Sequence, residues 1–228
     1  MEQPIADMRI RPAKRFAPFA PVQRRVPSAP YDPRFRRLIG AGWSSLPEPV
    51  RRRFSKRVVD DRVVIYRGVI REARFSIAGW LFAQACRIVG APLPLGREKG
   101  LPAAVSVMED REGRGQFWTR TYARKRGFPQ VIHSAKRFAG PTGLEERIGF
   151  GIGMALKVSA IDDGIEFRSD HYFIAVAGRR LRLPDWMTPG ETVVKHCHVD
   201  DDSFVFSLQL KHRWLGELVY QEGLFHDA

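Results

Sequence analysis

The sequence contains only two cysteines, Cys86 and Cys197, in 228 residues. Two cysteines are too few for the disulfide framework of a small secreted protein, and they predict reduced thiols in a cytoplasmic protein. Long apolar runs are also missing, because the longest, residues 77–90, is interrupted by polar side chains and is too short to span a bilayer. Residues 1–30 contain no apolar run of the kind that a secretory signal requires.

The sequence has no Gly-x-Gly-x-x-Gly loop between a strand and a helix. Residues 149–155, "GFGIGMA", are rich in glycine but lie among predicted strands, so no nucleotide cofactor is expected. In "KHCHVDDD" the side chains of His196, His198 and Asp200 alternate along a strand, and with His171 they could supply part of a zinc or iron site. Because two histidines at this spacing are a weak signal, we predict rim or surface histidines and no metal site.

Acidic residues are scarce in the first quarter of the chain. Residues 1–58 hold 14 Lys and Arg against 4 Asp and Glu, a net charge of +10, whereas residues 59–228 hold 24 against 21. The total of +13 therefore comes mainly from the N-terminal part. Such a segment favours contact with nucleic acid or an anionic membrane surface, and the candidate cluster is Arg51, Arg52, Arg53, Lys56 and Arg57. A charge run is also typical of a solvated helix face.

Proline is concentrated in residues 1–30, which are basic and hold prolines at positions 4, 12, 18, 21, 27 and 30. Proline at this density breaks helices, and the segment has no hydrophobic periodicity. We predict a flexible tail over 1–30 and a single domain over 31–228. With 44% hydrophobic and 11% aromatic residues, the chain has enough apolar material for a sizeable core.

Three helices and one strand are predicted at the start of the domain. Asp32-Pro33 indicates the start of one short helix, and the capping-box pattern Ser45-Leu-Pro-Glu48 indicates a second. A strand over 63–75 is followed by a third helix over 77–89, with Ser76 as its cap. Because this helix is apolar around most of its surface, it is expected to plug or flank a barrel; a lid or an interfacial segment is the alternative.

From residue 101 onward the sequence changes to short β-rich runs separated by turn sequences such as "DREGRG", "GPTG" and "DDDS". No run in this half has the length and spacing of a crossover helix, so the strands are predicted to be antiparallel. So many consecutive strands must curl to bury one face. The predicted fold class is therefore α+β: N-terminal helices followed by an eight- to ten-stranded antiparallel meander in a barrel or a strongly curved sheet.

Residues 116–122, "QFWTRTY", place Trp118, Arg120 and Tyr122 at alternate positions, on one face of a strand. If this face lines the barrel, Arg120 needs an acidic partner, because a lone buried charge is strongly destabilising. Glu145 and Glu146 are the candidates, since both lie in a predicted strand of the same sheet. The alternatives are an exposed face that stacks on a ligand and an ordinary outer wall.

Several short motifs together resemble one bacterial family. They are Trp118-x-Arg120, Ser134, Glu146-Arg147-x-Gly149, Asp163-Gly164, Leu183-Pro184 and Leu215-Gly216. Over roughly residues 33–226 the chain is similar to the domain of unknown function 4166. That family is often fused behind a dehydrogenase-like nucleotide-binding domain, so the resemblance implies small-molecule or lipid metabolism and a separate dehydrogenase-like protein as a partner. The family's Tyr-x-Gly-Trp-like ending appears here as Tyr220-Gln-Glu-Gly223-Leu-Phe.

Three functional hypotheses follow. The first is a hydrophobic or amphipathic small molecule bound inside the barrel, with the ligand-binding residues Trp118, Arg120, Tyr122, Glu146, Arg147 and His171. The second is an isomerase or hydrolase acting on a lipid-like substrate, with Glu146, His133 or His171 as acid–base groups. The third is nucleic-acid or anionic-membrane binding through the basic N-terminal region. No catalytic signature is strong, so the sequence leaves open whether the protein is an enzyme.

Overall fold

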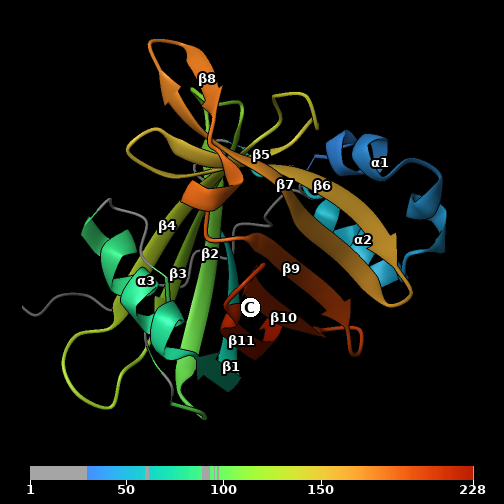
Figure 1. The fold of residues 1–228 in the computed structure, drawn as a ribbon. Helices are drawn as coiled ribbons and strands as arrows, with labels where there is room; N and C mark the ends of the chain where they lie inside the picture. The colour runs from blue at the N-terminus through green and yellow to red at the C-terminus, as the bar shows by residue number, and fades with distance from the viewer. Residues whose placement is uncertain (1–29, 60–61, 89–92, 95, 97, 228) are drawn as a thin grey trace, which may run out of the picture.

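The computed structural model describes residues 30–59, 62–88, 93, 94, 96 and 98–227. The predicted flexible tail lies outside these residues, except for Pro30. Within them, ten antiparallel strands close into a barrel (Figure 1). The barrel strands are β1 (Val64–Phe75), β2 (Pro102–Asp110), β3 (Gly115–Tyr122), β4 (Gln130–Arg137), β5 (Glu145–Gly149), β6 (Ile152–Ile161), β7 (Gly164–Val176), β9 (Glu191–His198), β10 (Ser203–His212) and β11 (Gly216–Asp227). The predicted α+β fold with an antiparallel barrel is confirmed.

Two long strands close the barrel. β1 pairs with β2 on one side and with β11 on the other, which joins the first and last strands of the sheet. β7 pairs with β6 along its length and with β9 over Gly164–Arg168. Closure gives each barrel strand among the described residues a paired neighbour on both sides and turns one side chain in two toward the interior.

A short hairpin extends beyond the barrel wall. β8 (Arg179–Arg182) pairs only with Phe173–Val176 at the end of β7, and the 3₁₀ turn η2 (Asp185–Met187) follows it. Residues 177–180, "AGRR", have the composition of a turn between strands, but the two arginines begin β8. The strand was missed because its four residues are all exposed and give no alternation of buried and exposed positions.

Short N-terminal helices cover one end of the barrel. They are α1 (Arg34–Ile39), the 3₁₀ helix η1 (Gly40–Ser45) and α2 (Glu48–Phe54). The Asp32 carboxylate accepts the backbone N–H of Arg34 at 3.0 Å, as the predicted start of the first helix requires. The predicted capping box is wrong, because the Ser45 hydroxyl donates to the carbonyl of Gly42 and no side chain caps α2.

The helical end is held by aromatic packing and one buried arginine. The Phe35 ring lies 5.1 Å from the ring of Phe54 and 6.1 Å from that of Phe167 on β7. Arg53 extends from α2 into the barrel, where Nε lies 3.1 Å from Oδ1 of Asp227 and the guanidinium lies 4.7 Å from the ring centre of Phe204. These contacts fix α2 to the strands beneath it.

The third helix, α3 (Ile77–Ile88), flanks the other end of the barrel, as predicted. The Ser76 hydroxyl accepts the N–H of Gly79 at 3.0 Å, so Ser76 caps the helix as expected. At Gly79 the helix runs so close to β11 that an added Cβ would lie 1.8 Å from the carbonyl oxygen of Leu218. Ala78 and Phe82 pack against Leu218 and its neighbours in this close contact. No helix in the described part of the chain is long and apolar enough to cross a membrane.

Candidate ligand-binding site in the barrel interior

Strand β3 contributes one polar and two aromatic side chains to the barrel interior. Its register pairs Trp118 with Val107 and Arg120 with Val105 on β2, and both valines are buried. Arg120 and Tyr122 are each 9% exposed, whereas Phe117, on the opposite face of the strand, is 42% exposed. The interior placement of this face is therefore confirmed.

Arg120 belongs to a buried ion group formed by three neighbouring strands. Its Nη2 donates to Oε1 of Glu146 at 3.3 Å, and its Nη1 donates to the hydroxyl of Ser134 at 2.9 Å. On the other side of the carboxylate, Nζ of Lys136 donates to Oε2 of Glu146 at 2.8 Å. The pairing of Arg120 with Glu146 answers the question that the sequence left open between two glutamates.

The ion group carries more positive than negative charge. Burial opposes the charged form of Glu146, but the nearby Lys136 and Arg120 outweigh this effect and hold its pKa well below the usual range. Burial is also the main cause that lowers the pKa of Lys136; Glu146 opposes this shift and Arg120 adds to it. One carboxylate thus faces two cations, and the fully ionised group has a net charge of +1.

A cavity of about 120 Å³ lies beside this ion group and extends toward α3. Arg120, Ser134 and Glu146 supply its charged and hydroxyl groups, and Tyr172 and Thr192 add a second polar pair, whose hydroxyl oxygens are 2.6 Å apart. The remaining lining is mainly apolar and aromatic, with His133 as a further polar member, and includes Phe82, Cys86, Leu93, Tyr122, Ile132, Ile148, Met154, Pro189, Val194, Phe206, Leu208 and Leu210.

Burial keeps the tyrosine hydroxyls of the cavity neutral. Burial raises the pKa of Tyr122, which the charge of Arg120 only partly opposes. Burial likewise raises the pKa of Tyr172 to about 12, although Thr192 and Ser169 oppose the shift. Both residues therefore offer a neutral hydroxyl and an aromatic ring to the cavity at neutral pH.

The structure brings four of the six expected ligand-binding residues together. Arg120, Tyr122 and Glu146 line the cavity, and Trp118 lies directly behind them, with its ring centre 5.1 Å from Nζ of Lys136. Trp118 also lines a separate cavity of about 30 Å³ toward α2. These four residues form one continuous part of the interior wall.

The other two expected residues, Arg147 and His171, lie on the outer face of the barrel. Arg147 Nη2 donates to Oε2 of Glu145 at 3.0 Å, and its guanidinium lies 4.6 Å from the ring centre of Phe173. His171 Nδ1 lies 2.7 Å from Oδ2 of Asp170. Because adjacent residues of a strand face opposite sides, a group that includes Glu146 cannot include its neighbour Arg147. Their role in ligand binding stays a prediction.

The first histidine of the pattern on β9, His196, packs against aromatic side chains. His196 is 5% exposed and stacks on the ring of Phe204 with centroids 4.1 Å apart, so the expectation of a rim or surface position is wrong for this residue. Burial lowers the pKa of His196 to about 3, and the charge of Arg53 contributes to the shift. His171 belongs to the outer face of β7, and the described residues contain no group of three or more metal-ligating side chains.

The basic cluster on and after α2 is divided between interior and surface. Arg53 is buried, whereas Arg52 and Arg57 are exposed. Arg52 and Arg53 both donate to the carbonyl of Asp201, so part of their hydrogen-bonding capacity serves the β9–β10 turn. Contact of the exposed members of this cluster with an anionic surface stays a prediction.

Sequence reasoning missed Lys136 and did not assign Ser134 to the interior group. Both lie on β4, where Ile132, Ser134 and Lys136 alternate on the buried face. The same period-two rule that selected Trp118 and Arg120 would have selected them. A lysine in a strand is usually taken as an exposed residue, and this assumption concealed the second partner of Glu146.

Comparison with known proteins gives one match. The model of the family described as Domain of unknown function (DUF4166) matches residues 46–225, which include all ten barrel strands in whole or in great part. No curated protein and no solved structure matches the chain. The family resemblance seen in the sequence motifs is thereby confirmed.

Proposed function

For this chain, which belongs to the DUF4166 family, we propose that the barrel binds a hydrophobic or amphipathic small molecule whose polar end is an anion. The observation that carries the proposal is the cavity of about 120 Å³ with the Arg120–Glu146–Lys136 group at one side. Apolar pockets with a few convergent polar groups are typical small-molecule sites. The polar groups fix the orientation of a ligand, and the aromatic wall supplies contact area.

The charge of the ion group supports an anionic ligand. A buried ion is destabilising unless it is paired, and here Glu146 is shared between two cations 2.8 and 3.3 Å away. A ligand carboxylate beside Arg120 and Ser134 would bring the group to neutrality. Arg120 is suited to this role because its planar guanidinium presents five N–H donors. Two of these donors bond to Ser134 and Glu146, and the guanidinium has others that can bond to a ligand.

The volume of the cavity indicates that the part of the ligand buried inside the barrel is compact. An apolar cavity of about 150 Å³ is sufficient to bind benzene, so about 120 Å³ accommodates a group close to one aromatic ring. A benzoate-like acid fits this description, and in a longer amphiphile the rest of the molecule would extend toward α3. Phe82 and Tyr122 would contact the ring from two sides of the cavity.

The experiment is isothermal titration of the full chain with benzoate, benzyl alcohol and benzylamine, which share a ring and differ in charge. Benzoate should bind most tightly, benzyl alcohol about fivefold more weakly, and benzylamine not at all, because a charge-assisted hydrogen bond contributes about 1 kcal/mol more than a neutral one. Lys136→Met should abolish the preference for benzoate over the alcohol. Arg179→Gln, which alters an exposed arginine on β8, should leave all three affinities unchanged.

Two outcomes would count against the proposal in different ways. If none of the three probes binds at millimolar concentration, the interior is not a small-molecule site of this size. If benzyl alcohol binds as tightly as benzoate, the site exists but the excess charge does not select its ligand. Acid–base catalysis has less support, since the low pKa of Glu146 keeps this carboxylate ionised. His133 lines the cavity, but its Nδ1 lies 3.1 Å from the Thr119 hydroxyl and it makes no contact with Glu146 that would form an acid–base pair among the described residues, and His171 lies on the outer face beside Asp170.

A further inference from the structure

Large apolar side chains are exposed on three separate elements at the α3 end of the barrel. Trp186 on η2 is 70% exposed, Trp214 in the β10–β11 turn is 64% exposed, and Trp80 on α3 is 43% exposed. Each tryptophan has exposed apolar neighbours on its own element, namely Ile77, Leu81, Met187 and Leu215. We call these seven residues the tryptophan surface.

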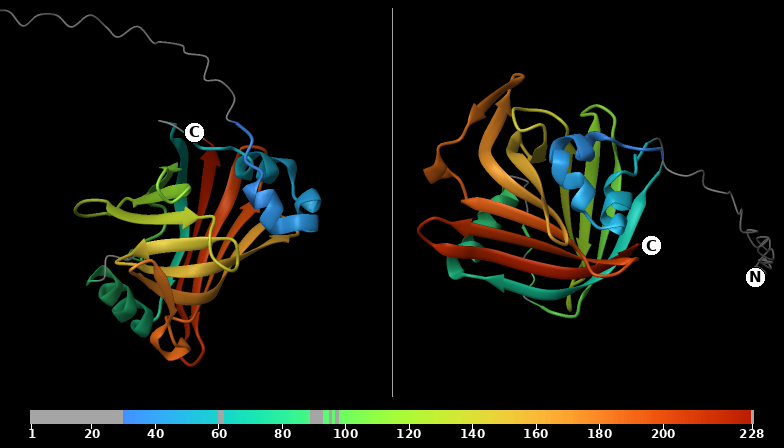
Figure 2. Two further views of the ribbon diagram at one scale, coloured as in Figure 1. Left: turned by 90° about the horizontal axis from the view of Figure 1, so that it is seen from above. Right: turned by 90° about the vertical axis from the view of Figure 1, so that its right-hand side faces the viewer.

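Backbone contacts bring the three elements to the same end of the molecule. The N–H of Ser76, just before α3, donates to the carbonyl of Leu218 near the start of β11 at 3.1 Å. Gly190, which follows η2, lies so close to β10 that an added Cβ would meet the carbonyl oxygen of Lys211. In both views of Figure 2, α3, η2 and the β10–β11 turn lie at one end of the barrel, while α1 and α2 lie away from it.

The exposed positions are held by local hydrogen bonds. In the β10–β11 turn, the ring Nδ1 of His212 accepts the N–H groups of Trp214 and Leu215 at 3.3 and 3.4 Å. After η2, the Thr188 hydroxyl donates to the carbonyl of Asp185 at 2.8 Å. On α3, the buried side is occupied by residues that pack on β11, so Trp80 and Leu81 necessarily face outward.

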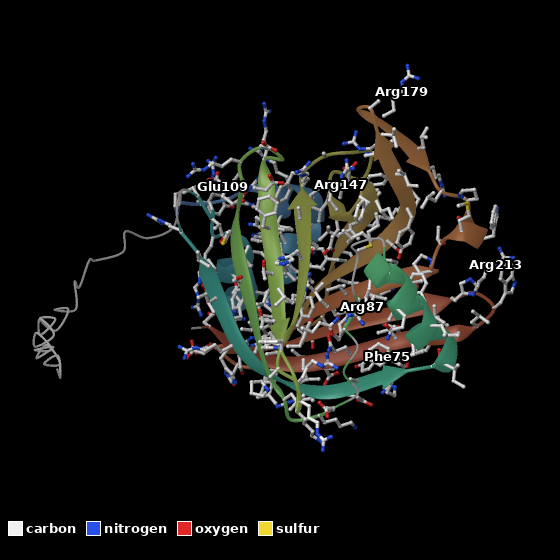
Figure 3. All side chains as sticks on the ribbon, turned by 90° about the vertical axis from the view of Figure 1, so that its left-hand side faces the viewer. Phe75, Arg87, Glu109, Arg147, Arg179 and Arg213 are labelled. Atoms are coloured by element: carbon white, nitrogen blue, oxygen red, sulfur yellow. The ribbon has the colours of Figure 1, made fainter. Side chains whose placement is uncertain are left out.

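Positive charge accompanies the apolar side chains. Arg213 lies 4.0 Å from the ring centre of Trp214, and Lys211 and Arg87 are exposed on the adjoining elements. Figure 3 labels Arg87 on α3 and Arg213 in the turn. Of the described residues on these three elements, Asp185 of η2 is the exposed carboxylate, against three exposed cations. Tryptophan combined with Lys and Arg is typical of the interface between lipid headgroups and acyl chains.

The tryptophan surface is built on the elements that line the interior cavity. Phe82 and Cys86 of α3 line the cavity from the same helix that carries Trp80 on its outer side. Pro189, two residues after Met187, lines it from the η2 side, and Leu210 lines it from β10. A binding partner that contacted the tryptophan surface would therefore lie next to the cavity, and not at the end of the barrel that α1 and α2 cover.

We propose that the α3 end of the barrel docks on an anionic lipid bilayer through the tryptophan surface, with Arg87, Lys211 and Arg213 against the headgroups. This inference goes beyond the proposed function, because it concerns a surface outside the cavity and does not require a bound ligand. The three tryptophans insert at the level of the headgroups, and the cavity then faces the membrane. Docking is peripheral and uses the outside of α3, η2 and the turn.

The test is flotation of the full chain with vesicles of phosphatidylcholine, with and without phosphatidylglycerol. Wild-type protein should float with the anionic vesicles, and Trp80→Ser/Trp186→Ser/Trp214→Ser should bind at least about tenfold more weakly, since the buried apolar area is lost. Arg213→Gln should weaken binding about fivefold, which corresponds to about 1 kcal/mol per charge. The matched control is Tyr31→Ser/Val199→Ser, which removes two exposed apolar residues outside the tryptophan surface and should bind like wild type.

A second measurement is quenching of tryptophan fluorescence by lipids brominated on the acyl chains. Trp43 is buried and Trp118 is partly buried, so the exposed tryptophans should account for the quenching of wild-type emission. Unchanged flotation of the triple variant would overturn the proposal, because the basic N-terminal part would then bind the vesicles without the tryptophans. The proposal would also be overturned if lipid bromination did not quench the emission of wild-type protein, or if wild-type protein did not float with the anionic vesicles.

Discussion

Glu146→Gln tests the energetics of the buried ion group. The substitution keeps the size of the side chain but removes the charge that pairs with Arg120 at 3.3 Å and Lys136 at 2.8 Å. Removing one partner of a buried ion pair costs about 3–5 kcal/mol, because an uncompensated charge stays in the interior. In a domain of this size, about 1 kcal/mol shifts Tm by about 2–4 °C, so Tm should fall by roughly 6–20 °C.

Lys136→Met is the informative counterpart to Glu146→Gln. It removes the excess cation and leaves Arg120 and Glu146 as a balanced pair, with a side chain of similar length in the place of the lysine. Replacing a buried ion by a well-packed apolar residue is often neutral or stabilising. The expected change in the free energy of unfolding is therefore within about 1 kcal/mol of zero, or favourable.

Urea unfolding followed by circular dichroism measures both variants, and m-values equal to that of wild type would show that the comparison is valid. The order of the two effects matters more than either value. If Glu146→Gln cost less than about 1 kcal/mol, or less than Lys136→Met, the three residues would not form the strongly coupled group described above. That result would indicate that water reaches the Glu146 carboxylate.

Three further predictions concern other parts of the molecule. The pKa of His196 is about 3 in the folded protein and about 6.5 unfolded, so below pH 6.5 the unfolded state takes up the additional proton. Stability should fall by about 1.4 kcal/mol per pH unit from 6.5 toward 3, and His196→Leu should remove this slope from urea titrations. Gly79→Ala should cost about 1–3 kcal/mol because α3 must move away from Leu218, whereas Gly96→Ala, with open space around it, should be neutral in the same assay. Burial raises the pKa of Cys86 to about 11, so at pH 8 its alkylation by iodoacetamide, followed by peptide mass spectrometry, should be about 100-fold slower than that of a free thiol; an equal rate would contradict its half-buried position.

The fold could be predicted in large part because its signals are local. Period-two alternation and turn sequences predicted an antiparallel meander of eight to ten strands, and helix α3 was predicted from its cap at Ser76 and its apolar composition. Closure could not be read from the sequence, since it depends on pairing β1 with β11 and β6 with β7. The four-residue β8 was missed because exposed arginines carry no burial pattern.

The candidate site was predicted where one strand determined it and missed where several strands met. Alternation placed Arg120 on an interior face and required an acidic partner, but the choice between Glu145 and Glu146 depended on the register of β4 with β5. Lys136 entered the group through that register, opposite Glu146. The excess positive charge therefore became apparent only when three strands were placed side by side.

The most direct test of an anionic ligand in the barrel interior is a crystal structure of the full chain grown with 4-bromobenzoate. The account predicts a single anomalous bromine signal inside the barrel on the α3 side of the ion group, with the carboxylate within hydrogen-bond distance of Arg120 and Ser134. A bromine signal confined to the outer face, or an interior carboxylate turned away from Arg120, would contradict the account.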